Sequence, residues 1–66
     1  MPVIQFDGPK MTRDQKARLV EAFAKQASQI LDIPEDAFVT ILRENEMDNI
    51  GNGSELLSDK FRHQDG

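Results

Sequence analysis

The chain has 66 residues, of which 12 are acidic and 8 basic, with a net charge of −4 and no cysteine. A domain of this length buries only about 60% of the surface of its unfolded chain, and without cysteine it gains nothing from disulfides or a thiolate-bound metal, so we expect an oligomer. The sequence has no basic cluster, no apolar run of roughly 20 residues and no signal peptide before its first predicted strand, which indicates a cytoplasmic protein that binds neither nucleic acid nor a membrane.

The first predicted element is a strand from Val3 to Asp7, whose side chains alternate between two faces. Pro2 comes directly before it, and a small second residue commonly allows the initiator methionine to be removed. Removal would leave the proline nitrogen as a free secondary amine. An α-amino group has a pKa of roughly 7.7–8.0, which modest desolvation or a nearby cation lowers further. Pro2 is therefore a candidate general base, although its position also suits a plain strand start that needs no hydrogen-bond donor.

A helix is predicted from Thr12 to Leu31, after a Gly-Pro pair that ends the strand. Thr12 and Gln15 fit a capping box, in which each side chain accepts from the backbone N–H of the other. The helix should end near Leu31, because Pro34 keeps the residue before it from helical angles. The apolar residues of the helix recur at helical spacing and form one stripe: Leu19, Val20, Phe23, Ala24, Ala27, Ile30 and Leu31.

After one tight turn at residues 34–37, a second strand is predicted from Phe38 to Glu44, with apolar residues on both faces. Strand, helix and strand in this order form a βαβ unit, so the strands should be parallel and the crossover right-handed. The fold class is therefore α/β (α+β). One helix covers only one face of a two-stranded sheet, and strands that are apolar on both faces are usually covered on both. We expect partner subunits to cover the other face.

The rest of the chain turns polar. The glycine-rich stretch 49–54 predicts a small hairpin or a loop, and Ser54 to Lys60 predicts a last helical turn. We expect one domain over residues 1–60 and a flexible tail over residues 61–66. No metal site is expected, because His63 is the only histidine and lies in the tail, and the acidic run 44–48 is typical of a solvated loop.

Several short motifs follow Pro2 in a fixed order: Asp14-Gln15-Lys16, Leu31-Asp32 with Pro34, Ile50-Gly51 with Gly53, and Glu55-Leu56. Together they resemble the 4-oxalocrotonate tautomerase family, the short-chain branch of the tautomerase superfamily, from Met1 to about Lys60. The resemblance implies a βαβ protomer with a C-terminal hairpin, paired into four-stranded dimers and assembled as a homohexamer. It also implies proton transfer without a cofactor: the Pro2 amine removes a proton next to a carbonyl of a small unsaturated keto acid and returns it to another carbon, through a dienol.

Elimination favours the same residue as general base. A base that works at pH 7 needs a pKa near that value. The chain has no cysteine or tyrosine, and its one histidine, His63, fits a solvated residue of the tail. A lysine or a carboxylate would need a pKa far from its ordinary one. An N-terminal amine needs only a small lowering of its pKa to act as a base at pH 7.

The substrate-binding positions depart from the family pattern. Where the resemblance implies two arginines and an aromatic residue, this sequence has Met11, Val39 and Ile50. Neither a methionine nor a valine side chain donates a hydrogen bond, so a clamp for two carboxylates is not expected at these positions. The apolar residues suggest a substrate that carries less charge than a dicarboxylate.

Cations elsewhere are candidate substitutes for the missing arginines. Lys10 lies one residue from the first arginine position, but it also suits a solvated loop. Arg43 shares a strand face with Val39, but it also suits an ion pair with an acidic residue at the end of a strand. Arg13 fits better on the surface of the first helical turn.

The leading interpretation is a tautomerase with Pro2 as general base and with Lys10, Met11, Val39, Arg43 and Ile50 around the substrate. A second interpretation is a hydratase or dehalogenase of the same superfamily that uses the same nitrogen. A third is a non-catalytic oligomeric scaffold that has lost its substrate clamp.

Overall fold

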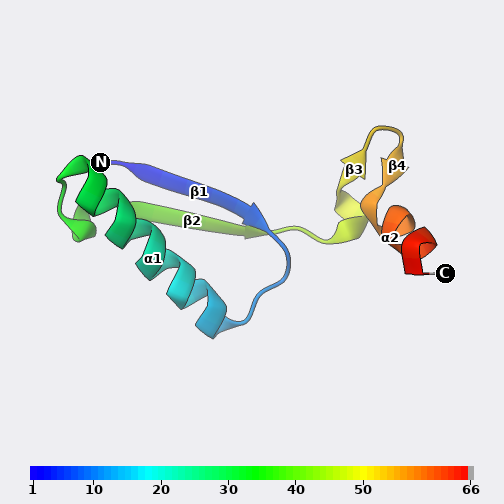
Figure 1. The fold of residues 1–66 in the computed structure, drawn as a ribbon, viewed down its shortest axis with the longest axis horizontal. Coiled ribbons are helices and arrows are strands. Elements are labelled where there is room, and N and C mark those ends of the chain that lie inside the picture. Colours follow the sequence, from blue (N-terminus) through cyan, green and yellow to red (C-terminus); the bar gives the residue numbers. More distant parts are fainter. Residues whose placement is uncertain (66) are drawn as a thin grey trace.

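The computed structural model describes residues 1–65, with side chains as far as Phe61. Its larger part is a βαβ unit made of β1 (Val3–Gly8), α1 (Arg13–Leu31) and β2 (Val39–Glu44) (Figure 1). The two strands are parallel and pair along their whole length. The predicted order and direction of these elements are confirmed.

The start of α1 is set by the residues that the sequence indicates, and its end near Leu31 is also as predicted. Thr12 Oγ1 accepts from the Gln15 N–H at 3.1 Å, and Gln15 Oε1 accepts from the Thr12 N–H at 2.9 Å, so the capping box is confirmed. At the other end Asp32 takes the left-handed conformation, with φ at 57°, and its N–H bonds the Ser28 carbonyl. The chain then turns through the short 3₁₀ helix η1 (Glu35–Ala37). Phe38 closes this turn instead of starting β2, because its N–H donates to the Glu35 carbonyl.

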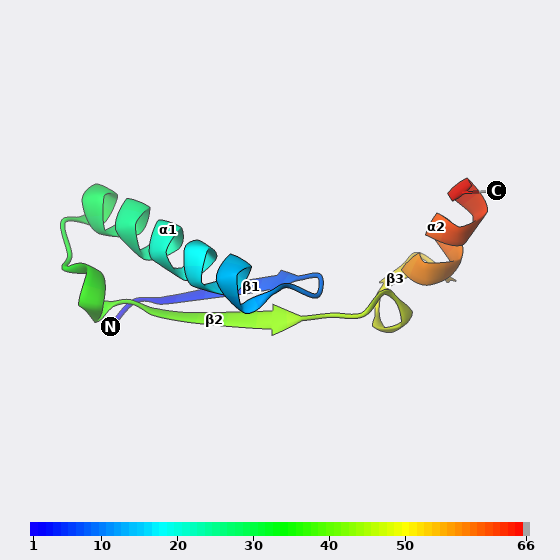
Figure 2. The ribbon, with the colours of Figure 1, turned by 90° about the horizontal axis from the view of Figure 1, so that it is seen from below.

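Helix α1 covers one face of the sheet, as Figure 2 shows. The side chains of Ile4 and Phe6 on β1 point to this face and are half-buried, and so is Leu42 on β2. The Phe6 and Phe23 rings join the two layers, with centroids 5.5 Å apart, a spacing at which aromatic pairs attract. Gly8 leaves room for the Phe6 ring, since a Cβ at this position would lie 2.6 Å from it.

The opposite face of the sheet is open. Val3, Val39 and Ile41 lie on it with 48%, 37% and 41% of their surface exposed, and no other element of the described chain covers them (Figure 2). Among the described residues none is fully buried, and the chain measures 47 × 25 × 16 Å. The uncovered face that the sequence predicts is confirmed, and its burial against another copy stays a prediction.

The C-terminal part extends beyond the end of β2 and does not fold back onto the βαβ unit (Figure 1). It consists of the 3₁₀ helix η2 (Met47–Asn49), the antiparallel pair β3 (Gly51–Asn52) and β4 (Glu55–Leu56), and helix α2 (Leu57–Asp65). The predicted hairpin is confirmed, with Gly53 at its tip at a φ of +65° that favours glycine.

Helix α2 differs from the sequence prediction in extent. It begins at Leu57 and continues to Asp65, past the boundary predicted at Lys60. The flexibility predicted for residues 61–66 stays a prediction, and Gly66 lies outside the described residues. Neither described helix combines the length and the apolar character that crossing a bilayer requires.

Introducing a charge on the open face should weaken association. In Ile41→Lys, a side chain that another copy would bury becomes cationic, so we expect the subunit dissociation constant to rise by about 10- to 100-fold, or ~1.5–3 kcal/mol. Sedimentation velocity over a concentration series measures this. Gln26→Lys, which adds the same charge on the exposed side of α1, is the matched control. Unchanged assembly of Ile41→Lys would show that this face is not an interface.

Candidate functional site

Pro2 is fixed at the N-terminal end of the sheet. Its carbonyl accepts from the Val39 N–H at 3.0 Å, directly before the first paired residues of β1 and β2. The proline ring is half-buried, whereas Met1 is 90% exposed. Only the carbonyl of Pro2 takes part in the hydrogen bonds between the two strands, so its ring nitrogen is not used by the sheet. Val39, predicted from the sequence as a substrate-binding residue, is therefore a neighbour of Pro2.

Arg43 lies at the other end of the same strands and is held by a carboxylate. Its Nε donates to Asp7 Oδ1 at 2.8 Å and its second guanidinium nitrogen donates to Asp7 Oδ2 at 3.1 Å. Asn45 also donates to Asp7, at 3.3 Å. The hydrogen bonds from Arg43, and then from Asn45, lower the pKa of Asp7, and the Asp7 carboxylate raises the pKa of Arg43. Of the two roles that the sequence left open for Arg43, the described chain shows the ion pair.

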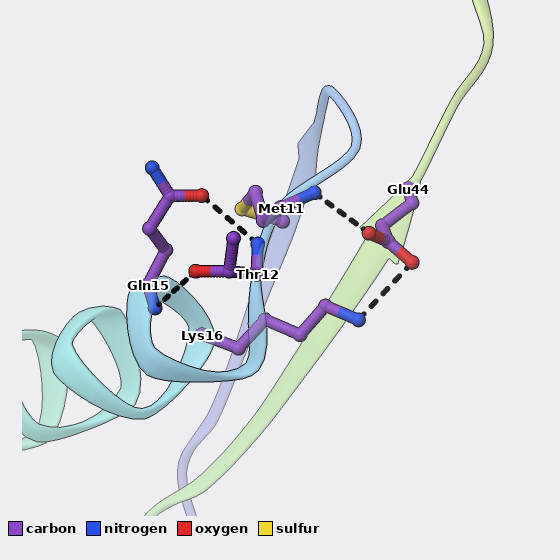
Figure 3. A network of polar contacts seen from close by, with 5 residues as sticks. All are labelled: Met11, Thr12, Gln15, Lys16 and Glu44. Carbon is purple, nitrogen blue, oxygen red and sulfur yellow. Dashed lines mark hydrogen bonds and ion pairs between the residues drawn. The ribbon is translucent and has the colours of Figure 1, made fainter.

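Met11 and Lys10 lie in the loop between β1 and α1, next to Glu44 at the end of β2. The Met11 N–H donates to Glu44 Oε2 at 2.8 Å, and Lys16 Nζ lies 3.1 Å from Glu44 Oε1 (Figure 3). The Met11 N–H, followed by Lys16, lowers the pKa of Glu44. Lys10 is exposed and lines a shallow hollow of about 500 Å³ together with these residues.

A single chain does not bring these predicted residues into one site. Pro2 and Val39 meet at one end of the sheet. Lys10 and Met11 meet at the other end, about 16 Å away for a strand of this length. Ile50 lies in the C-terminal part, where its carbonyl accepts from the Leu57 N–H. A site that contains all of them needs residues from more than one chain.

Sequence reasoning missed Glu44 and Lys16 as part of this region. Lys16 falls on the polar side of the helix pattern, and the acidic run that begins at Glu44 suggested only a solvated loop. The structure shows instead that Glu44 joins β2 to the loop and to the first turn of α1. In the part of the chain that the structure describes, no group of three His, Cys, Asp or Glu residues is placed to hold a metal ion.

Comparison with known proteins identifies the family. A family model described as "Tautomerase enzyme" matches residues 2–60. The chain belongs to the tautomerase family. A search of curated proteins gave no match.

Solved structures agree with this assignment. DmpI from Archaeoglobus fulgidus is 29% identical, with a TM-score of 0.80 over 88% of this chain and 100% of that one. An unfused 4-OT is 25% identical, with a TM-score of 0.81 over 89% and 98% of the two chains. A 4-oxalocrotonate tautomerase homologue is 28% identical, with a TM-score of 0.78 over 89% and 95%. The chain is thus a divergent member of the 4-oxalocrotonate tautomerase group, and the α+β fold inferred from its sequence is confirmed.

Asp7 and Glu44 should titrate below the ordinary pKa values of 3.8 and 4.5. Both bind their partners as anions, so the stability they contribute is complete above the ordinary values. It is lost as the pH falls through the lower values of the folded protein. Side-chain carboxyl NMR shifts, followed from neutral pH to roughly pH 2, measure both midpoints. Arg43→Gln should raise the midpoint of Asp7 and leave that of Glu44 in place, and an unchanged Asp7 midpoint would contradict the assignment.

Proposed function

We propose that this tautomerase-family protein is a cofactor-free isomerase that uses the Pro2 nitrogen as general base on a small unsaturated keto acid. The observation that carries the proposal is the position of Pro2. The family match begins at this residue, and Pro2 is anchored to Val39 through its carbonyl alone. Once Met1 is removed, the ring nitrogen is a basic secondary amine at a fixed place. While Met1 is attached, the same nitrogen is a tertiary amide without a basic lone pair.

The reaction needs a neutral amine at physiological pH. The pKa of an ordinary α-amino group is roughly 7.7–8.0, and partial burial lowers it further because it disfavours the charged form. Pro2 is half-buried within one chain, and packing of a second chain against the neighbouring open face adds to this burial. The neutral amine takes a proton from the carbon next to the substrate carbonyl and returns it to another carbon of the conjugated chain. Backbone N–H groups or a cation stabilise the negative charge on the dienolate oxygen.

The cation and the remaining pocket come from other copies. Lys10 and Met11 lie about 16 Å from Pro2 along the strands of one chain, too far to contact one small substrate together with it. The open face with Val3, Val39 and Ile41 supplies the surface for association, and the family resemblance implies a homohexamer. The proposed site therefore combines Pro2 and Val39 of one chain with Lys10, Met11 and Ile50 of neighbouring chains.

The residues of this proposed site favour a substrate with one carboxylate. Met11, Val39 and Ile50 offer apolar contacts and no charged donor. Arg43 is held by Asp7, and Lys16 is held by Glu44. Within the described residues Lys10 is in no ion pair and is our candidate for binding a single carboxylate.

Replacement of Pro2 distinguishes the tautomerase hypothesis from the scaffold hypothesis. Pro2→Ala should lower kcat for the tautomerisation of a monocarboxylate enol by about 10²- to 10⁴-fold, the usual contribution of a general base, and leave the size of the oligomer unchanged. Ultraviolet absorbance follows the reaction, and light scattering gives the size. Protein that retains Met1, identified by intact mass, is the matched control and should be equally inactive. Full activity of Pro2→Ala would show that Pro2 is not the general base, and no activity in wild-type protein that lacks Met1 would favour the scaffold.

The pKa of the Pro2 nitrogen tests the mechanism directly. In wild-type protein that lacks Met1, we expect a value below the roughly 7.7–8.0 of an ordinary α-amino group, because the site disfavours the charged amine. NMR titration with ¹⁵N-labelled proline measures it, and the rise of kcat/KM with pH should share this midpoint. An ordinary value would indicate a solvated nitrogen and a site without function.

A further inference from the structure

We propose that Glu44 determines the charge of the substrate, because its own carboxylate occupies a carboxylate-binding position beside Lys10 and Met11. This inference rests on the proposed function and names the residue that limits the substrate to one carboxylate. Glu44 is not assigned a part in the proton transfer itself.

The contacts of Glu44 are those that a substrate carboxylate would make. One oxygen accepts from the Met11 N–H, just before α1, at 2.8 Å, and the other lies 3.1 Å from the Lys16 ammonium (Figure 3). A backbone N–H and an ammonium group are favourable partners for any carboxylate. Both partners are already taken by a side chain of the protein.

Glu44 also faces the space where a ligand would lie. The hollow of about 500 Å³ is lined by Lys10, Met11, Thr12, Gln15, Lys16 and Glu44. A second hollow of about 570 Å³ shares Lys10 and Glu44 and is bounded further by Asn45 and Glu46. The Glu44 and Lys16 side chains are 35% and 39% exposed, so both charges can be reached by an anion that enters the hollow.

The net charge around the first hollow favours a ligand with one carboxylate over a ligand with two. Two lysines and one glutamate leave a net charge of +1, which a single carboxylate neutralises. A second carboxylate would meet Glu44 in the first hollow and Glu46 in the second. Like charges brought together oppose binding, so the region accepts a monoanion and rejects a dianion.

Two matched probes test this without relying on turnover. Fumarate and crotonate are planar unsaturated acids of similar size, the first with two carboxylates and the second with one. Dissociation constants come from NMR titrations of the full chain without Met1, with the Met11 amide as reporter. We expect wild-type protein to prefer crotonate. Glu44→Gln keeps an oxygen that accepts from the Met11 N–H but removes the charge, and should shift the preference towards fumarate by about fivefold.

Lys16→Gln distinguishes a charge effect from simple damage. It breaks the same ion pair as Glu44→Gln but removes the positive partner, so it should shift the preference about fivefold in the opposite direction, towards crotonate. Loss of structure alone would move both variants in the same direction. Glu21→Gln, which removes one exposed negative charge on α1, is the control and should bind both probes as wild type does.

Opposite shifts in the two variants support the assignment of Glu44. A preference that does not change in Glu44→Gln, or that changes in the same direction in both variants, overturns it. These binding results can fail without the proposed function failing. If Pro2→Ala abolishes activity but Glu44→Gln leaves the preference unchanged, the protein is still a tautomerase and only the role of Glu44 is wrong. Inactive wild-type protein that lacks Met1 would remove the proposed function whatever the probes show.

Discussion

The constraint on which the structure depends is that one helix covers only one face of a two-stranded sheet. Phe6 and Phe23 join α1 to the sheet on that side, while Val3, Val39 and Ile41 face outward on the other. A chain without a fully buried residue in its described part gains little from the hydrophobic effect relative to the conformational entropy lost on folding. Burial of the open face against another copy, as we propose, would supply what the single chain lacks.

The same constraint places the proposed chemistry between chains. Parallel pairing starts both strands at one end of the sheet, so Pro2 lies beside Val39 and both are far from the loop that carries Lys10 and Met11. Pro2, at the start of β1, is therefore too far from Lys10 of its own chain to share a small ligand with it. In the proposed site, assembly and catalysis depend on the same surfaces, so a change that weakens the contacts between copies should also lower activity.

Local chemistry explains what the sequence could predict. The start of α1 follows from Thr12 and Gln15, whose mutual hydrogen bonds join residues three positions apart, and its end follows from Pro34. The contacts that could not be predicted from the sequence join residues that are far apart in the chain. Arg43 meets Asp7, and Glu44 meets Met11, only because the strands pair in one particular register. Several carboxylates could serve either cation, and hydrophobic periodicity does not distinguish among them.

These long-range pairs change what the charged residues can do. The fold brings three cations, Arg43, Lys16 and Lys10, to the same end of the sheet. In the fold, Asp7 neutralises the first and Glu44 the second. The charge available to a ligand is therefore smaller than the composition of this region suggests, and it is set by strand register as much as by residue type. Met11 and Val39 stand at the positions where the family resemblance implies arginines. These apolar residues and the neutralised cations therefore both favour the substrate that we propose, one that carries a single negative charge.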